Sequence, residues 1–200
     1  MRLVIFCLPA FALGLALTGC DRQKAAAPQG EAPAVANAVA AAGAPEAPVP
    51  TGRLDRSHQG QPAPDMIFED GQGQPVRLSA FRGQPLLVNL WATWCAPCVV
   101  EMPTLDALAA RETGSLRVVA ISQDDQDGRR KVSDFFAAHQ FGRLEPYLDS
   151  RMQVMRAVQA DTLPTTILYN SQGEEVWRMT GMSDWQDQRA ARLLLEADAG

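Results

Sequence analysis

The sequence predicts an α/β domain in which a mixed central β-sheet is flanked by helices. Continuous apolar runs at residues 86–91 and 116–121 are typical of strands buried on both faces of a sheet. A segment with helical spacing follows each run, which is the pattern of parallel strands joined by helices. Residues 165–169 and 175–179 flank the turn sequence Asn170-Ser171-Gln172-Gly173, which predicts an antiparallel hairpin. Parallel and antiparallel neighbours together make the predicted sheet mixed.

A second hairpin is expected at the start of the domain. Residues 66–69 and 75–78 are extended segments on either side of the turn sequence Asp70-Gly71-Gln72-Gly73. We therefore expect a β-hairpin extension ahead of the main sheet.

Ser183 is expected to cap the last of four helices. The four segments with helical spacing are 96–112, 129–140, 151–158 and 184–197.

Length and composition limit the classes of protein that the chain can be. Its 200 residues are enough for one ordinary domain with extensions, and 46% hydrophobic residues are enough to form a core. The net charge is −5 and no run is rich in Lys and Arg, so nucleic acid is not an expected partner. No apolar stretch reaches the roughly 18 to 20 residues of a membrane-spanning helix, which excludes a polytopic membrane protein.

The first residues have the pattern of an export signal. Met1-Arg2 precedes an apolar run over residues 3–17, which is too short to span a bilayer. The sequence Leu17-Thr18-Gly19-Cys20 resembles the lipobox of bacterial lipoproteins, so residues 1–19 are interpreted as a signal peptide and Cys20 as a lipid-modified first residue. An ordinary signal that leaves Cys20 as a free thiol, and an uncleaved anchor, are the alternatives. Asp21 resembles the inner-membrane retention signal of some bacterial lipoproteins.

The next segment is interpreted as a flexible tether. Residues 20–60 are dominated by Ala and Pro and contain no aromatic side chain, so they cannot bury enough apolar surface to offset the entropy of ordering. The folded domain is expected to occupy residues 61–200. A lipid at Cys20 would hold that domain at a membrane surface.

Two of the four cysteines remain for redox chemistry. Cys7 leaves with the signal and Cys20 is expected to carry lipid, whereas Cys95 and Cys98 form a Cys-x-x-Cys motif where a strand passes into a helix. Unpaired amides and the helix dipole favour a thiolate at Cys95, the predicted nucleophile, and Cys98 is the predicted resolving thiol. A zinc site, a purely structural disulfide and copper transfer are the alternatives.

The motif resembles a known family. The sequence Trp94-Cys95-Ala96-Pro97-Cys98 is similar to the active site of thioredoxin-fold proteins. Residues 89–94 before it and Glu101-Met102-Pro103 after it resemble the TlpA-like and ResA-like branch, which comprises membrane-tethered thiol:disulfide oxidoreductases of bacterial envelopes. The resemblance covers residues 62–198 and implies a thioredoxin-like fold.

The resemblance also implies roles for single residues. Pro164 corresponds to a proline with a cis peptide bond beside the cysteines, and Leu163 before it would shape the substrate groove, together with Trp94, Ala96 and Pro97. Glu101 matches a glutamate to which a proton-transfer role is attributed; the alternative is an acidic residue that only favours the helix dipole. Asn89 stands where ordinary thioredoxins bury an aspartate and cannot take up a proton.

These features predict an enzyme of the cell envelope. The expected reaction is reduction of disulfides in exported proteins, such as apocytochromes c or proteins with copper sites, by a lipid-anchored protein that faces the periplasm from the inner membrane. A membrane-embedded thiol donor would supply the electrons, and no cofactor or metal is expected beyond the Cys95–Cys98 disulfide. A disulfide-forming oxidant, a copper-binding metallochaperone module and a peroxidase of the peroxiredoxin type are the alternatives.

Overall fold

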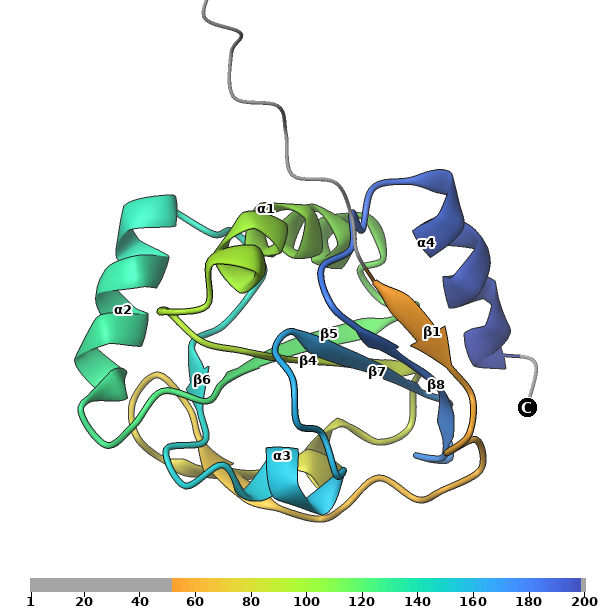
Figure 1. Ribbon diagram of the computed structural model, residues 1–200, viewed down its shortest axis with the longest axis horizontal. Helices are drawn as coiled ribbons and strands as arrows, with labels where there is room; N and C mark the ends of the chain where they lie inside the picture. The colour runs from red at the N-terminus through yellow and green to blue at the C-terminus, as the bar shows by residue number, and fades with distance from the viewer. Residues whose placement is uncertain (1–51, 199–200) are drawn as a thin grey trace, which may run out of the picture. The chain divides into compact units, whose positions relative to one another are not determined.

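The computed structural model describes residues 52–198 of the chain (Figure 1). The predicted signal peptide, Cys20 and most of the predicted tether lie outside these residues. Within residues 52–198, none of the helices has the length and apolar character that crossing a membrane would require.

One mixed sheet forms the centre of the described part of the chain, and its strand order is β1-β8-β7-β4-β5-β6-β2-β3. β4 runs parallel to β5 and antiparallel to β7, so the mixed sheet expected from the sequence is confirmed. β2 and β3 pair antiparallel, which confirms the N-terminal hairpin. The strand bounds are β1 Arg53–Asp55, β2 Ile67–Glu69, β3 Pro75–Arg77, β4 Leu86–Trp91, β5 Arg117–Ser122, β6 Tyr147–Leu148, β7 Thr165–Tyr169 and β8 Glu175–Thr180.

Helices cover both faces of the sheet. Figure 1 shows α1 and α4 on one side of it and α3 on the other. The α-helices are α1 Ala96–Arg111, α2 Gly128–His139, α3 Gln153–Ala157 and α4 Gln188–Leu194, and the short 3-10 segments are η1 Leu78–Phe81 and η2 Leu195–Asp198.

The alternation of side chains along β4 decides which residues meet α1. Leu87 and Trp91 pack in the core that contains the buried face of α1, whereas Leu86, Val88 and Leu90 pack in the core on the α3 side. Because successive side chains of a strand point to opposite faces, the side chain at position 89 faces α1. This parity places a polar strand residue under the helix that carries the cysteines.

The sequence prediction of a tether through residue 60 reaches too far. Residues 53–55 form β1, which pairs antiparallel with β8, and Leu54 packs against the α1-side core. Arg56 also forms an ion pair with Glu196, at 2.7 Å. A three-residue strand has too few apolar positions to show alternation, and its partner strand lies at the far end of the chain.

The last helix is shorter than expected, and its cap is a different residue. α4 begins at Gln188, and the carboxylate of Asp187 accepts a hydrogen bond of 2.6 Å from the Ala190 amide. The Ser183 amide instead donates to a buried side chain on α1. A turn at residues 185–186 therefore precedes the helix, and Asp187 is its N-cap.

Candidate active site

A disulfide lies at the N-terminus of α1. Cys95 is the N-cap residue of the helix and Cys98 lies in its first turn, with an S–S distance of 2.04 Å. The Cys95 carbonyl accepts the first helical hydrogen bond, from the Val99 amide at 3.0 Å. Pro97 fits in this turn because the amide that it lacks would have no helical partner. The free amides of this turn favour a negative charge at Cys95 when the disulfide is reduced.

The two cysteines of the disulfide differ in their access to solvent. Cys95 exposes 7% of its surface and Cys98 none. Trp94 is 65% exposed, and Ala96 and Pro97 are exposed as well, so the protein surface around Cys95 is formed by its sequence neighbours. This asymmetry means that an incoming sulfur can approach Cys95 and not Cys98.

A buried carboxylate fixes the loop that presents Cys95. Asp124, two residues after β5, accepts hydrogen bonds from the Thr93 amide at 2.9 Å and the Thr93 hydroxyl at 2.6 Å. The Ser122 hydroxyl donates to the same carboxylate at 2.6 Å. Because Thr93 lies two residues before Cys95, these bonds hold the strand-to-helix junction on the neighbouring strand.

The Leu163–Pro164 peptide bond is cis, as the family resemblance implied. Pro164 directly precedes β7, and the register pairs Thr165 of β7 with Leu90 of β4. The end of β4 leads to the cysteines, so Pro164 and Cys95 lie at the same end of these two neighbouring strands. The Pro164 carbonyl accepts a hydrogen bond of 2.9 Å from the Gly181 amide.

Glu101 lies on the buried face of α1 and is 1% exposed. One carboxylate oxygen accepts a hydrogen bond of 2.7 Å from the Asn89 side-chain amide. The other accepts one of 3.0 Å from the Ser183 backbone amide. Asn89 also donates to the Thr166 hydroxyl at 2.9 Å, so Asn89 joins α1 to the start of β7.

Burial raises the pKa of Glu101 to about 7, and the hydrogen bonds from Ser183 and Asn89 offset part of that rise. No charged group contributes, because the groups that face this carboxyl are neutral. The indole N–H of Trp185 also faces it, outside hydrogen-bond geometry. A carboxyl group with a pKa near neutrality can both accept and donate a proton at physiological pH.

The sequence did not predict the contacts of three residues of this site: Asp124, Thr166 and Ser183. Each acts through a hydrogen bond to a residue far away in the chain, and a single Asp, Thr or Ser at a strand end or in a turn has no distinctive spacing. The role of Asn89 as a bridge also went unrecognised, although its position under α1 follows from strand parity.

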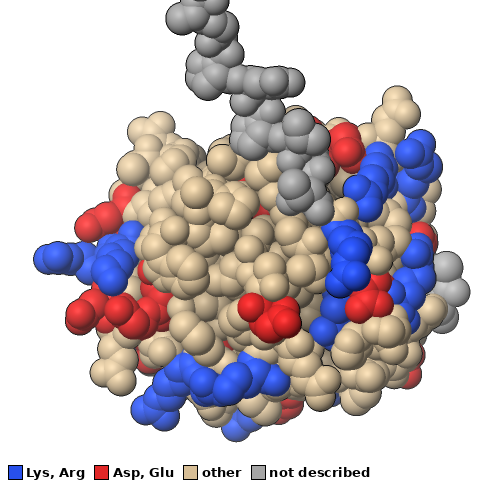
Figure 2. All heavy atoms as spheres, viewed as in Figure 1, with Lys and Arg blue, Asp and Glu red and all other residues tan. Residues whose placement is uncertain are grey.

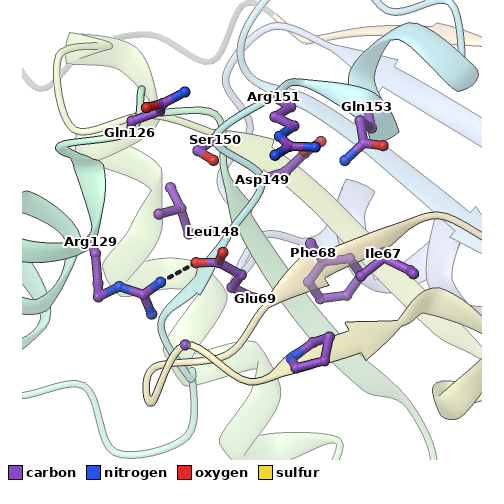
Figure 3. A pocket seen from close by; sticks show the side chains of 12 residues that line it. Ile67, Phe68, Glu69, Gln126, Arg129, Leu148, Asp149, Ser150, Arg151 and Gln153 are labelled. Carbon is purple, nitrogen blue, oxygen red and sulfur yellow. Dashed lines mark hydrogen bonds and ion pairs between the residues drawn. The ribbon is translucent and has the colours of Figure 1, made fainter.

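A hollow of about 440 Å³ lies apart from the cysteines (Figure 3). β2, the start of α2 and the chain after β6 line it, and Arg129 and Glu69 form an ion pair across it. Neither cysteine belongs to its lining. No cluster of three or more His, Cys, Asp or Glu side chains suited to a metal ion occurs in residues 52–198.

The surface over α1 is poor in charge. Figure 2 shows that Lys, Arg, Asp and Glu side chains gather toward the margins of this face, while its middle is mostly uncharged. Trp94 and Val100 are large apolar side chains exposed at and near the start of α1. Exposed apolar groups beside a reactive sulfur suit contact with another protein.

Comparison with known proteins identifies relatives of this site. The model of the AhpC/TSA family matches residues 59–178. Thiol-disulfide oxidoreductase ResA of Geobacillus kaustophilus is 34% identical over 130 residues, which are 64% of this chain and 72% of that protein. ResA of Bacillus subtilis is 31% identical over 125 residues, which are 62% of this chain and 68% of that protein.

Solved structures have the same fold. StoA from Bacillus subtilis has a TM-score of 0.53 and 25% sequence identity, and the match covers 68% of this chain and 98% of StoA. A thiol-disulfide oxidoreductase from Bacteroides fragilis has a TM-score of 0.57 and 24% identity, over 68% of this chain and 98% of that one. The thioredoxin-like fold implied by the sequence is confirmed.

Proposed function

The chain belongs to the AhpC/TSA family and is a thiol-disulfide oxidoreductase of the ResA type, and from this premise we propose that it reduces disulfides of exported proteins through Cys95 and Cys98. The observation that carries this proposal is the site itself. A disulfide joins the partly accessible Cys95 at a helix N-terminus to the fully buried Cys98, and a cis-proline lies at the same end of the sheet.

The reaction starts from the dithiol form. The Cys95 thiolate attacks one sulfur of the substrate disulfide; that S–S bond breaks, a mixed disulfide forms, and the other substrate sulfur leaves as a thiolate. The Cys98 thiolate then attacks the Cys95 sulfur and releases the second substrate thiolate. Two electrons pass to the substrate, and the Cys95–Cys98 disulfide remains, which a donor dithiol must reduce again.

Glu101 is the proposed proton carrier for Cys98. Both side chains lie on the buried face of α1, three residues apart, and neither is open to bulk water. Cys98 has to lose a proton before it attacks the mixed disulfide, and a carboxyl group with a pKa of about 7 can take it. Asn89 cannot substitute for it, because an amide does not titrate in this range.

The proposed location is the bacterial cell envelope. The signal sequence, the lipobox-like Leu17-Thr18-Gly19-Cys20 and the Ala/Pro-rich segment support an inner-membrane lipoprotein that faces the periplasm. The periplasm is oxidising, so a reductant there needs electrons from a membrane-embedded thiol donor. Apocytochromes c and proteins with cysteine copper sites are the proposed substrates, since their cysteines must be reduced before they bind haem or metal.

Trapping of mixed disulfides tests the proposal. A full-length Cys98→Ala protein in its native host should accumulate covalent complexes with exported Cys-containing proteins, because the resolving attack is lost. Non-reducing electrophoresis and mass spectrometry identify the partners, and Cys95→Ala is the matched control that should trap none. Equal complexes with both variants would contradict the assignment of Cys95 as nucleophile.

The reduction potential of the Cys95–Cys98 disulfide tests the direction of the reaction. A value near that of thioredoxin, about −270 mV, would support a reductant; one near that of DsbA, about −120 mV, would indicate an oxidant instead.

A further inference from the structure

The residue that precedes β1 is hydrogen-bonded to two residues in and just ahead of α4. Gly52 is buried, and its amide donates to the Met182 carbonyl at 2.8 Å. Its carbonyl accepts a hydrogen bond of 3.1 Å from the Arg189 guanidinium. Both backbone polar groups of Gly52 are therefore used to fix the chain against the turn between β8 and α4.

One peptide group connects Gly52 to Glu101. The Met182 carbonyl, which accepts the Gly52 amide, and the Ser183 amide, which donates to Glu101, belong to the same planar unit. The two bonds thus form a chain from the Gly52 N–H through one peptide plane to the Glu101 carboxylate. Hydrogen bonds in such a chain polarise one another, so the first strengthens the second.

Steric crowding explains why position 52 is a glycine. A Cβ atom there would lie 2.4 Å from the Ser183 hydroxyl oxygen and 2.8 Å from the Met179 sulfur. Real Cβ atoms do not approach other atoms so closely, so a Cβ at position 52 requires either the Ser183 and Met179 side chains or the start of β1 to move. A shift of β1 would pull the Gly52 amide from the Met182 carbonyl and would weaken the bond from the Ser183 amide to Glu101.

We propose that Gly52 is a positioning residue for Glu101 and that β1 is part of the active-site structure. The start of β1 holds the Met182–Ser183 peptide group in the place from which its N–H reaches the carboxylate. This inference rests on the proposed role of Glu101 as proton carrier. It also means that the start of β1 is linked to the proposed proton carrier through one peptide group.

The direction of the effect follows from the groups around Glu101. Asn89 on β4, the Ser183 amide and Trp185 ahead of α4 face it, all of them neutral, and Cys98 shares its helix face. The nearest cation bound to this chain of bonds is Arg189, on the Gly52 carbonyl. The Ser183 bond lowers the pKa of Glu101. Its loss must therefore shift the titration of Glu101 to higher pH.

The test is Gly52→Ala in the full-length chain. The Glu101 carboxyl is followed by ¹³C NMR against pH, and Cys98-dependent thiol exchange is followed over the same range. The midpoint of the Glu101 titration should rise by roughly one pH unit, the size expected when a hydrogen bond to a charged group is lost. Adding Ser183→Ala removes the nearest clashing atom and should restore part of the shift. Gly142→Ala is the control, because the nearest atom to a Cβ there lies 4.0 Å away.

A folded Gly52→Ala protein with the wild-type Glu101 titration would overturn the proposal. If the variant does not fold, Arg189→Met removes the donor to the Gly52 carbonyl and should give a smaller shift in the same direction; no shift in that protein overturns the proposal equally. A shifted Glu101 titration with an unchanged pH profile of thiol exchange would support positioning by Gly52 and reject Glu101 as proton carrier.

Discussion

Glu101 and Glu175 are both buried glutamates, and they differ in what binds them. Glu101 is 1% exposed and Glu175 is 3% exposed. Both oxygens of Glu175 accept hydrogen bonds of 2.6 Å from the guanidinium of Arg178. Glu101 accepts its bonds from an amide side chain and a backbone N–H, which carry no charge.

The hydrogen-bonding partner, and not burial alone, decides whether a buried carboxyl group is structural or can titrate. Glu175 is neutralised in an ion pair, and Arg178 also donates to the Val158 carbonyl at 2.7 Å, which ties β8 to the end of α3. That arrangement is structural. Glu101 has no cation to compensate its charge, so burial raises its pKa to about 7. The carboxyl group can therefore bind and release a proton near neutral pH.

The largest effect is expected from breaking the ion pair. Arg178→Met leaves the Glu175 carboxylate buried without a cation, which should lower the free energy of unfolding by about 3–5 kcal/mol. Urea denaturation measures this value. Glu175→Gln combined with Arg178→Met should recover much of the loss, because no charge then remains buried. A single variant as stable as the wild type would show that the pair is not structural.

The next effect is a pH dependence of stability that comes from Glu101. Its pKa is about 7 in the folded protein and 4.5 without burial, so the folded state binds the proton more tightly. The contribution is complete below pH 4.5 and is lost as the pH rises toward about 7. The loss should be about 3 kcal/mol for the oxidised protein.

Glu101→Gln is the matched control for this measurement, because the amide does not titrate. The unfolding free energies of the two proteins, measured from pH 4 to pH 8, should diverge over the window between the two pKa values. All other groups titrate in both proteins and cancel in the difference. Parallel curves would mean that folding leaves the pKa of Glu101 unchanged.

The smallest of the three effects is on the reaction rate. Glu101→Gln should slow thiol exchange near neutral pH on the order of 100-fold, about 2.7 kcal/mol, and should remove the titration near pH 7 from the pH–rate profile. Glu196→Gln, on an exposed carboxylate paired with Arg56, is the control and should leave the rate unchanged. An unaltered profile in Glu101→Gln would refute the proton-carrier role.

The sequence predicted the elements whose signals are local. The bounds of β4 and β7 agree with the apolar runs at 86–91 and 165–169, and the Cys-x-x-Cys motif lies at the helix start as expected. β1 could not be predicted, because a three-residue strand exists only through its pairing with β8. The parts of the site that were missed are likewise contacts between distant segments, such as the Ser183 amide on Glu101.

The strand order also has a consequence for folding. Both edges of the sheet, β1 and β3, come from the first part of the described chain, whereas the partner of β1 is the last strand, β8. Contacts between the two ends of a chain carry a high loop-closure cost and slow the approach to the native state. The final ladder therefore closes only after the whole domain has been synthesised, and a nascent chain that ends before β8 holds no finished sheet.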